Sequence, residues 1–143
     1  MTAPDLVGRF GPHPARSAAQ ASMEAVVAGD RAGWLALFAP DAHVEDPVGE
    51  SPLDPTGQGH HGIDAIAGFW DSTIAANRIS FVIDASYAVG NECANVGSIT
   101  TELPDGTKAI TNGVYTYAVD EHGALVRLRA FWEFASMQFV SPS

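Results

Sequence analysis

The chain has 143 residues, of which 46% are hydrophobic and 17% are charged, and its formal net charge is −10. This length and composition are those of one globular domain, which excludes a disordered chain. The negative charge disfavours binding to nucleic acid and to an anionic membrane surface, and no apolar run is long enough to cross a bilayer.

The N-terminal segment predicts no regular structure. Residues 1–14 are rich in proline and glycine and predict a loose arm, which leaves residues 15–143 as a single domain. The arm also lacks the apolar centre of a secretory signal. The single cysteine, Cys93, cannot form an intramolecular disulfide, and these features together predict a cytoplasmic protein.

Two short helices are predicted next. Ser17 and Gln20 form a capping-box pattern, which predicts a first helix over about residues 17–28. Gly29 ends this helix and Asp30 caps the next, so that the two form a helical hairpin. The second helix presents four apolar side chains: Trp34, Leu35, Leu37 and Phe38.

One acidic residue is placed on an apolar face by strand alternation. Residues 42–46 predict a short strand that Pro47 ends, and alternation puts the polar His43 and Glu45 on one face. Asp46 therefore belongs to the opposite, apolar face. Burial there raises the proton affinity of a carboxylate, which makes Asp46 a candidate general base in a hydrophobic pocket. The alternative is a structural carboxylate that bonds the loop backbone beside Pro47.

The second half of the chain predicts a sheet. Residues 47–61 form a loop, and a third helix follows from about residue 62 to residue 77. From residue 79 the pattern has a period of two and predicts four antiparallel strands, over residues 79–89, 92–103, 107–119 and 124–140. In the last strand, alternation assigns one face to Val126, Leu128, Ala130, Trp132 and Phe134, and the other to Arg127, Arg129 and Glu133. Helices followed by strands indicate an α+β fold, with helices packed on one side of the sheet.

Three familiar motifs are not supported by their context. Residues 57–62 match the dinucleotide-binding pattern G-x-G-x-x-G, but no strand precedes them and no βαβ unit surrounds them. His60 and His61 are adjacent on a loop, and no carboxylate or cysteine at ligand spacing joins them and His43, so no metal site is expected. Cys93 has no identifiable base to activate it as a nucleophile.

The segment around Asp46 resembles a known family. Residues 44–49, with the sequence Val-Glu-Asp-Pro-Val-Gly, resemble the strand-to-loop segment of bacterial ketosteroid isomerases, in the nuclear-transport-factor-two-like and SnoaL-like superfamily. The resemblance extends over about residues 17–135 and is close to an actinobacterial subgroup. Further matching segments are residues 28–30, 37–42, 62–66, 69–70, 120–123 and 128–132. The resemblance implies a cone, in which a curved, mixed, mostly antiparallel sheet is wrapped by three helices around a steroid-sized cavity.

The resemblance also implies a mechanism without a cofactor. Asp46 would move a proton between two carbons of a 3-oxo-steroid, or of a similar enolisable apolar ligand, while two donors hold the enolate oxygen. In ketosteroid isomerase, the standard example of this arrangement, the donors are a tyrosine and a protonated carboxylic acid. The matching positions here hold Ser22 and Tyr115, or Gly113 after a two-residue shift. We therefore predict Tyr115 as the electrophile, assisted through water by Ser22 or Asn112, unless Tyr115 is only a strand aromatic.

The resemblance further implies an apolar, steroid-like ligand and a homodimer formed through the outer sheet face. Beside Ser22 and Asn112, the predicted ligand contacts are Met23, Trp34, Phe38, Phe69, Trp70 and Trp132. The candidates for the dimer face are Cys93, Ile99, Thr101 and Phe139.

Two other functions remain open. The first is a non-catalytic steroid or apolar-metabolite binding protein that keeps the cavity without the donor pair. The second is a SnoaL-like cyclase or an epoxide hydrolase with an Asp–Arg–Asp site. The placement of Arg127 and Arg129 on the solvated strand face disfavours the epoxide hydrolase.

Overall fold

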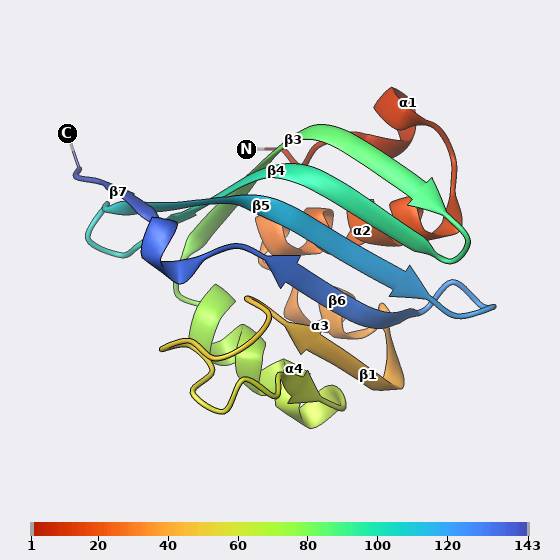
Figure 1. Cartoon of the computed structure of the whole chain (residues 1–143), viewed down its shortest axis with the longest axis horizontal. Coiled ribbons are helices and arrows are strands. Elements are labelled where there is room, and N and C mark those ends of the chain that lie inside the picture. The colour runs from red at the N-terminus through yellow and green to blue at the C-terminus, as the bar shows by residue number, and fades with distance from the viewer. Residues whose placement is uncertain (1, 143) are drawn as a thin grey trace.

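The computed structural model describes residues 2–142, which form a curved, open sheet with helices on one side (Figure 1). The sheet has seven strands in the order β2-β1-β6-β5-β4-β3, with β7 paired to β5. Only β1 and β6 pair in parallel, and the other pairs are antiparallel. The strands are β1 (Phe38–Glu45), β2 (His60–His61), β3 (Arg78–Val89), β4 (Glu92–Glu102), β5 (Lys108–Val119), β6 (Leu125–Phe131) and β7 (Gln138–Val140). The predicted α+β fold with a mixed, mostly antiparallel sheet is confirmed.

The helices cover the concave face of this sheet. They are α1 (Leu6–Phe10), α2 (Pro14–Ala28), α3 (Arg31–Leu35) and α4 (Ile63–Phe69), which continues as a π-helical turn η1 (Trp70–Ile74), and a 3-10 turn η2 (Phe134–Ser136). Helix α2 packs against β3, β4 and β5, while α4 packs beside β1. Within the described residues, no helix is both long and apolar enough to span a membrane.

The prediction of a loose N-terminal arm is wrong for residues 6–10. Asp5 caps α1 by accepting a hydrogen bond from the Gly8 amide, and Leu6 is fully buried in the core. The Arg9 guanidinium donates to the Ile83 carbonyl of β3 at 2.7 Å, which ties the segment to the sheet. The composition of a short proline-rich segment indicates only its local preferences, so it could not predict these contacts with a distant strand.

The start of α2 also differs from the prediction. The helix begins at Pro14, and the N-cap is His13, whose ring nitrogen accepts from the Ala15 amide at 3.0 Å. Ser17 lies inside the first turn, where its amide bonds the His13 carbonyl. Proline is favoured at the first helical position because it has no amide hydrogen to leave unpaired. Asp30 caps α3 as predicted, by accepting from the Gly33 amide.

The last predicted strand is shorter than its alternating pattern suggested. Strand β6 ends at Phe131, and the chain then turns through η2 before β7 returns to pair with β5. A register shift opposite Val119 also breaks the alternation early in β6, so that Leu125 is fully buried while Val126 is only half-buried. Phe38, predicted in a helix, begins β1 instead. Alternation in the sequence carries no signal for a bulge, which adds one residue on one strand.

Candidate functional site

A cavity of about 330 Å³ lies between the concave sheet face and the helices. Its volume is in the range of small-molecule sites. The inward-facing residues of β5 line it along most of the strand, from Ala109 to Tyr117. The surrounding side chains are mostly apolar and come from α2, α3, α4, η1, β3, β4, β6, η2, β7 and the connections between these elements.

Asp46 faces this cavity directly after the end of β1. The Trp132 indole donates to a carboxylate oxygen of Asp46 (Nε1 to Oδ1) at 2.6 Å. Burial raises the pKa of Asp46 from its ordinary value of 3.8 to about 6, and the bond from Trp132 opposes this rise. Asp46 is the one ionisable carboxylate among the described residues that line the cavity. The site thus holds a single carboxylate that is about half ionised near pH 6.

The predicted alternation around Asp46 is confirmed. The side chains of His43 and Glu45 lie on the other face of β1, where Glu45 accepts from the Arg129 guanidinium at 3.2 Å and lies 3.2 Å from the His43 ring. Within the described residues, no loop amide donates to the carboxylate of Asp46, whose hydrogen-bond partner is Trp132. The alternative of a structural carboxylate held by the loop backbone therefore finds no support in the contacts.

Tyr115 also lines the cavity, but its hydroxyl is already engaged. The hydroxyl donates to the Thr111 carbonyl at 3.1 Å and lies 3.2 Å from the Thr111 hydroxyl. Tyr115 pairs with Ala130 across β5 and β6. Asp46 follows Glu45, the partner of Arg129, and is therefore level with Ala130 on the other side of β6. The fully buried Ala130 is the β6 residue that lies between them in the sheet.

Tyr117 is a cavity residue that the sequence analysis did not select. It occupies the next inward position on β5 after Tyr115 and is almost fully buried. Burial raises the pKa of Tyr117 well above its ordinary value, the Asp46 charge adds to this rise, and a hydrogen bond with Ser22 opposes it. Tyr115 and Tyr117 are two residues apart on one strand and therefore point to the same apolar face. This spacing is the sequence signal that could have identified Tyr117.

Four of the predicted ligand contacts line the cavity, namely Ser22, Trp34, Phe69 and Trp132. Three others are core residues behind it, namely Met23, Phe38 and Trp70, all nearly fully buried. The rings of Phe38 and Trp70 pack on Trp34 with centroids 4.7 and 5.2 Å from its ring. These aromatic side chains therefore support a cavity wall rather than forming it.

The positions near Asn112 do not contribute to the site. Asn112 is exposed, because it alternates with the inward-facing Thr111 and lies on the outer sheet face. At Gly113, a Cβ atom would lie only 2.2 Å from the Phe131 carbonyl oxygen, so no side chain fits there. The proposed assistance from Asn112 is therefore wrong, and position 113 leaves no room for an acid.

The residues suggested for a dimer face lie elsewhere. Ile99 and Thr101 line the cavity and Cys93 is buried, so these three do not lie on the outer sheet face, whereas Phe139 borders the cavity and is 64% exposed. Sequence parity divides a strand into two faces but does not say which face is outside. The outer face instead presents Val82, Val96 and Phe131, which are 60%, 38% and 41% exposed.

The comparisons with known proteins agree with this geometry. A family model described as a SnoaL-like domain matches residues 19–128, which is most of the chain. The chain belongs to the SnoaL-like family. A steroid Δ-isomerase from Nocardioides simplex is 31% identical over 110 residues, which cover 77% of this chain and 82% of that protein. The predicted relationship to ketosteroid isomerases is thereby confirmed.

Two solved structures of this SnoaL-like fold are closely similar. The Δ5-3-ketosteroid isomerase from Mycobacterium sp. superposes with a TM-score of 0.87 at 39% identity, covering 90% of this chain and 100% of the other. RV0760c from Mycobacterium tuberculosis, solved in complex with estradiol-17β-hemisuccinate, superposes with a TM-score of 0.85 at 36% identity, covering 90% of this chain and 100% of the other.

Proposed function

We propose that the protein is a steroid Δ-isomerase-like enzyme, which moves a double bond in a 3-oxo-steroid or a similar enolisable apolar ligand through Asp46. The observation that carries this proposal is the single carboxylate in an apolar cavity, with a pKa raised to about 6. A base with a pKa near the working pH combines an adequate ionised fraction with useful basicity. The relatedness to a steroid Δ-isomerase gives this chemistry a substrate class.

Asp46 would act on two carbons of one ligand. Its carboxylate takes a proton from the carbon beside the ketone, the electron pair moves to the ketone oxygen, and the proton returns two carbons further along. The reaction is an isomerisation, so nothing is oxidised or reduced and no co-reactant is consumed. The bond from Trp132 orients the carboxylate and stabilises its ionised form, which is the form that accepts the proton.

The enolate oxygen needs a hydrogen-bond donor, because losing one such donor typically costs about 100- to 1,000-fold in rate. Tyr115, the donor predicted from the sequence, could serve only by exchanging its bond to the Thr111 carbonyl for one to the ligand. This commitment of the Tyr115 hydroxyl supports the second candidate function, a steroid-binding protein without turnover.

The cavity composition does not support an epoxide hydrolase. No arginine belongs to the cavity lining formed by the described residues. Arg127 and Arg129 point outward, with Arg127 3.7 Å from Glu92 and Arg129 paired with Glu45. The arginine of an Asp–Arg–Asp site is therefore missing from the place where it would act.

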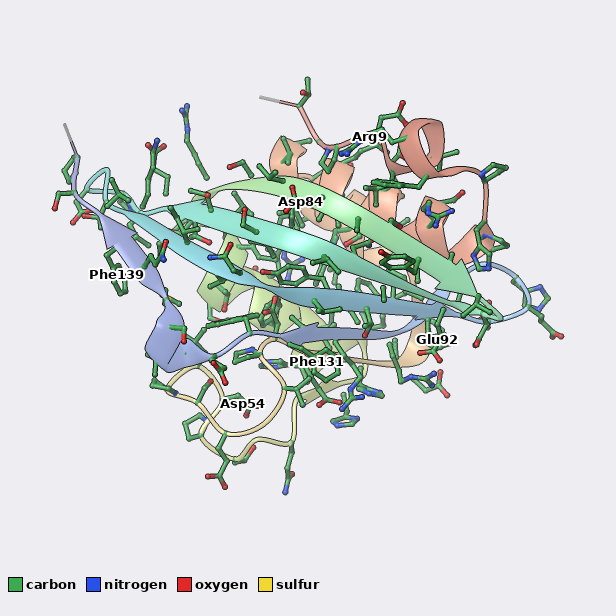
Figure 2. All side chains as sticks on the ribbon, turned by 45° about the horizontal axis from the view of Figure 1, so that its top comes forward. Arg9, Asp54, Asp84, Glu92, Phe131 and Phe139 are labelled. Carbon is green, nitrogen blue, oxygen red and sulfur yellow. The ribbon has the colours of Figure 1, made fainter. Side chains whose placement is uncertain are left out.

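Turnover of androst-5-ene-3,17-dione, followed by conjugated-enone absorbance, tests the proposal. The wild-type chain should convert the steroid, and Asp46→Asn should lower kcat about 100- to 10,000-fold, which is the usual contribution of a general base. Asp84→Asn is the matched control, because Asp84 is exposed on β3 away from the cavity (Figure 2). Steroid binding without turnover by the wild type would refute the isomerase and leave the binding protein.

We also propose that two copies of the chain associate through the outer sheet face. Val82, Val96 and Phe131 form an exposed apolar patch there, and Figure 2 shows Phe131 at the end of β6 on the open side of the sheet. Contiguous exposed apolar surface of this kind is typical of interfaces. Light scattering should give twice the 15.0 kDa mass of one chain, and a mass of one chain would contradict the proposal.

A further inference from the structure

Three side chains with hydrogen-bonding groups, Trp34, Ser22 and Tyr117, line the cavity. The Trp34 indole donates to the Ser22 hydroxyl oxygen (Nε1 to Oγ) at 3.0 Å, and both side chains are almost completely buried. An indole nitrogen can only donate, so the Ser22 oxygen is the acceptor and the Ser22 proton remains to be donated. The direction of the hydrogen bond between Trp34 and Ser22 is therefore fixed.

The Tyr117 hydroxyl is uncommitted in the cavity wall. Tyr117 lines the same cavity as Ser22 and Trp34 and is almost fully buried. Among the described residues, the structure gives its hydroxyl no acceptor at hydrogen-bond distance, in contrast to the bond between Trp34 and Ser22. Ser22 opposes the rise in the pKa of Tyr117 that burial causes. The phenolic proton is thus available to a ligand.

The other tyrosine of the cavity is in the opposite situation. The Tyr115 proton is already donated to the Thr111 carbonyl at 3.1 Å. The third tyrosine of the chain, Tyr87, is 67% exposed and lies outside the cavity. Of the two cavity tyrosines, Tyr117 is therefore the one whose hydroxyl has no acceptor among the described residues.

Tyr117 and Asp46 are placed on opposite sides of the cavity floor. Tyr117 pairs with Leu128 of β6, whereas Asp46 is level with Ala130, on the far side of that strand. Two strand spacings, about 10 Å, separate the backbones of Asp46 and β5. Both side chains line the same cavity, and the charge of Asp46 adds to the raised pKa of Tyr117. A flat ligand between them would present its ketone to Tyr117 and its acidic carbon to Asp46.

We propose that Tyr117 donates the hydrogen bond that holds the enolate oxygen, with Ser22 and Trp34 as positioning residues behind it in a relay that runs from Trp34 through Ser22 to Tyr117. This inference rests on the proposed isomerase function. As Asp46 removes the proton from carbon, negative charge develops on the ketone oxygen, and the Tyr117 proton is shared with that oxygen without being transferred. The charge then returns to carbon when Asp46 gives the proton back. A hydrogen bond from Ser22 to the Tyr117 oxygen would strengthen the donor, because each hydrogen bond polarises the next.

Burial supports this role, since it keeps Tyr117 protonated. The pKa of Tyr117 is well above its ordinary value, so at neutral pH the phenol donates a hydrogen bond and remains neutral. Ser22 stands on α2 at the position where the resemblance implies a tyrosine, and it lines the same cavity as Tyr117. The donor that the family carries on the helix would thus be supplied here from β5.

The test compares the three tyrosines as phenylalanine variants. Tyr117→Phe should lower kcat for the enone about 100- to 1,000-fold with little change in KM, because the lost bond is strongest in the transition state. Tyr87→Phe, outside the cavity, should turn over at the wild-type rate. Retention of turnover by Tyr117→Phe, or an equal or larger loss in Tyr115→Phe, would overturn the assignment.

A binding measurement separates this inference from the isomerase proposal itself. Tyr117→Phe should weaken the binding of estradiol, whose phenol can form a hydrogen bond with Tyr117, by about 2- to 12-fold. The same variant should bind 3-deoxyestradiol, which lacks that phenol, as tightly as the wild type. If the wild type binds both steroids but turns over no enone, the isomerase proposal fails. The difference between the two steroids in Tyr117→Phe still tests whether Tyr117 donates a hydrogen bond to the ligand. Equal effects on both ligands would refute the donor.

Ser22→Ala tests the relay with a variant that keeps Tyr117. It should lower kcat several-fold and also reduce the discrimination between the two ligands, because Tyr117 loses the group that directs its proton. If Tyr117→Phe fails to fold, Ser22→Ala is the variant that tests whether Tyr117 donates to the ligand. Unchanged kcat and unchanged discrimination in Ser22→Ala would show that the relay does not act on the ligand.

Discussion

The raised pKa of Asp46 implies that this carboxylate destabilises the folded protein above about pH 6. Asp46→Asn removes the charge, keeps the size of the side chain and retains an oxygen that can accept from Trp132. The variant should therefore lose the proposed activity and gain stability at the same time. Such an opposition between stability and activity is typical of catalytic groups.

The size of the effect follows from the pKa difference. The pKa of Asp46 rises from 3.8 to about 6 on folding, and about 1.36 kcal/mol corresponds to each unit, so the ionised form costs about 3 kcal/mol. The folded chain holds the Asp46 proton between pH 4 and 6, where the unfolded chain has released it. This contribution to stability is complete below about pH 4, decreases as the pH rises to about 6, and is absent at higher pH.

Urea unfolding at pH 4 and pH 8 measures the prediction. The new amide of Asp46→Asn leaves donors without partners, which costs about 1 kcal/mol of the gain. We therefore expect Asp46→Asn to exceed the wild type by about 2 kcal/mol at pH 8 and to show no advantage at pH 4. Asp84→Asn, on the exposed outer face, should change the free energy of unfolding equally little at both pH values. An Asp46→Asn chain no more stable than the wild type at pH 8 would show that the ionised carboxylate is stabilised in the fold, and the reasoning would fail.

Two further predictions concern the neighbours of the cavity. Trp132→Phe removes the indole donor 2.6 Å from Asp46, so the pKa of Asp46 should rise further and the midpoint of the kcat/KM pH profile should move upward by about one to two units, with an unchanged midpoint as the contrary result. Phe131→Glu places a charge in the exposed apolar patch of the outer face and should shift the light-scattering mass toward one chain at concentrations where the wild type is a dimer, whereas an unchanged mass would exclude this patch from the interface.

Local patterns in the sequence were sufficient for the catalytic candidate and for most of the sheet. The polar pair His43 and Glu45 requires solvent, and the period of two then leaves Asp46 only the apolar face. The same period identified β3, β4 and β5 almost to their ends, because long strands with one buried face repeat the signal many times. The resemblance around Asp46 indicated the family that the comparisons show.

What the pattern lacked was contact information. Phe69 lines the cavity, whereas Phe38 and Trp70 are buried behind it, although all three side chains are aromatic and apolar. Only their packing in the fold distinguishes a cavity-lining residue from a core residue. In the same way, alternation placed neither Leu125 nor the end of β6, because a register shift depends on the partner strand. The helix at residues 6–10 depends on its bonds to β3, which lie far away in the chain.

The sequence by itself determined that Asp46 faces an apolar interior, because residue parity on a strand is a local property. It could not decide between Tyr115 and Tyr117, which share parity and chemistry on the same strand. Only the tertiary structure showed that the Tyr115 proton is donated to Thr111, while Tyr117 lines the cavity beside Ser22 and Trp34 with no acceptor in hydrogen-bond contact among the described residues. Hydrogen-bond direction depends on which groups from distant segments meet, and the folded chain alone brings α2, α3 and β5 together.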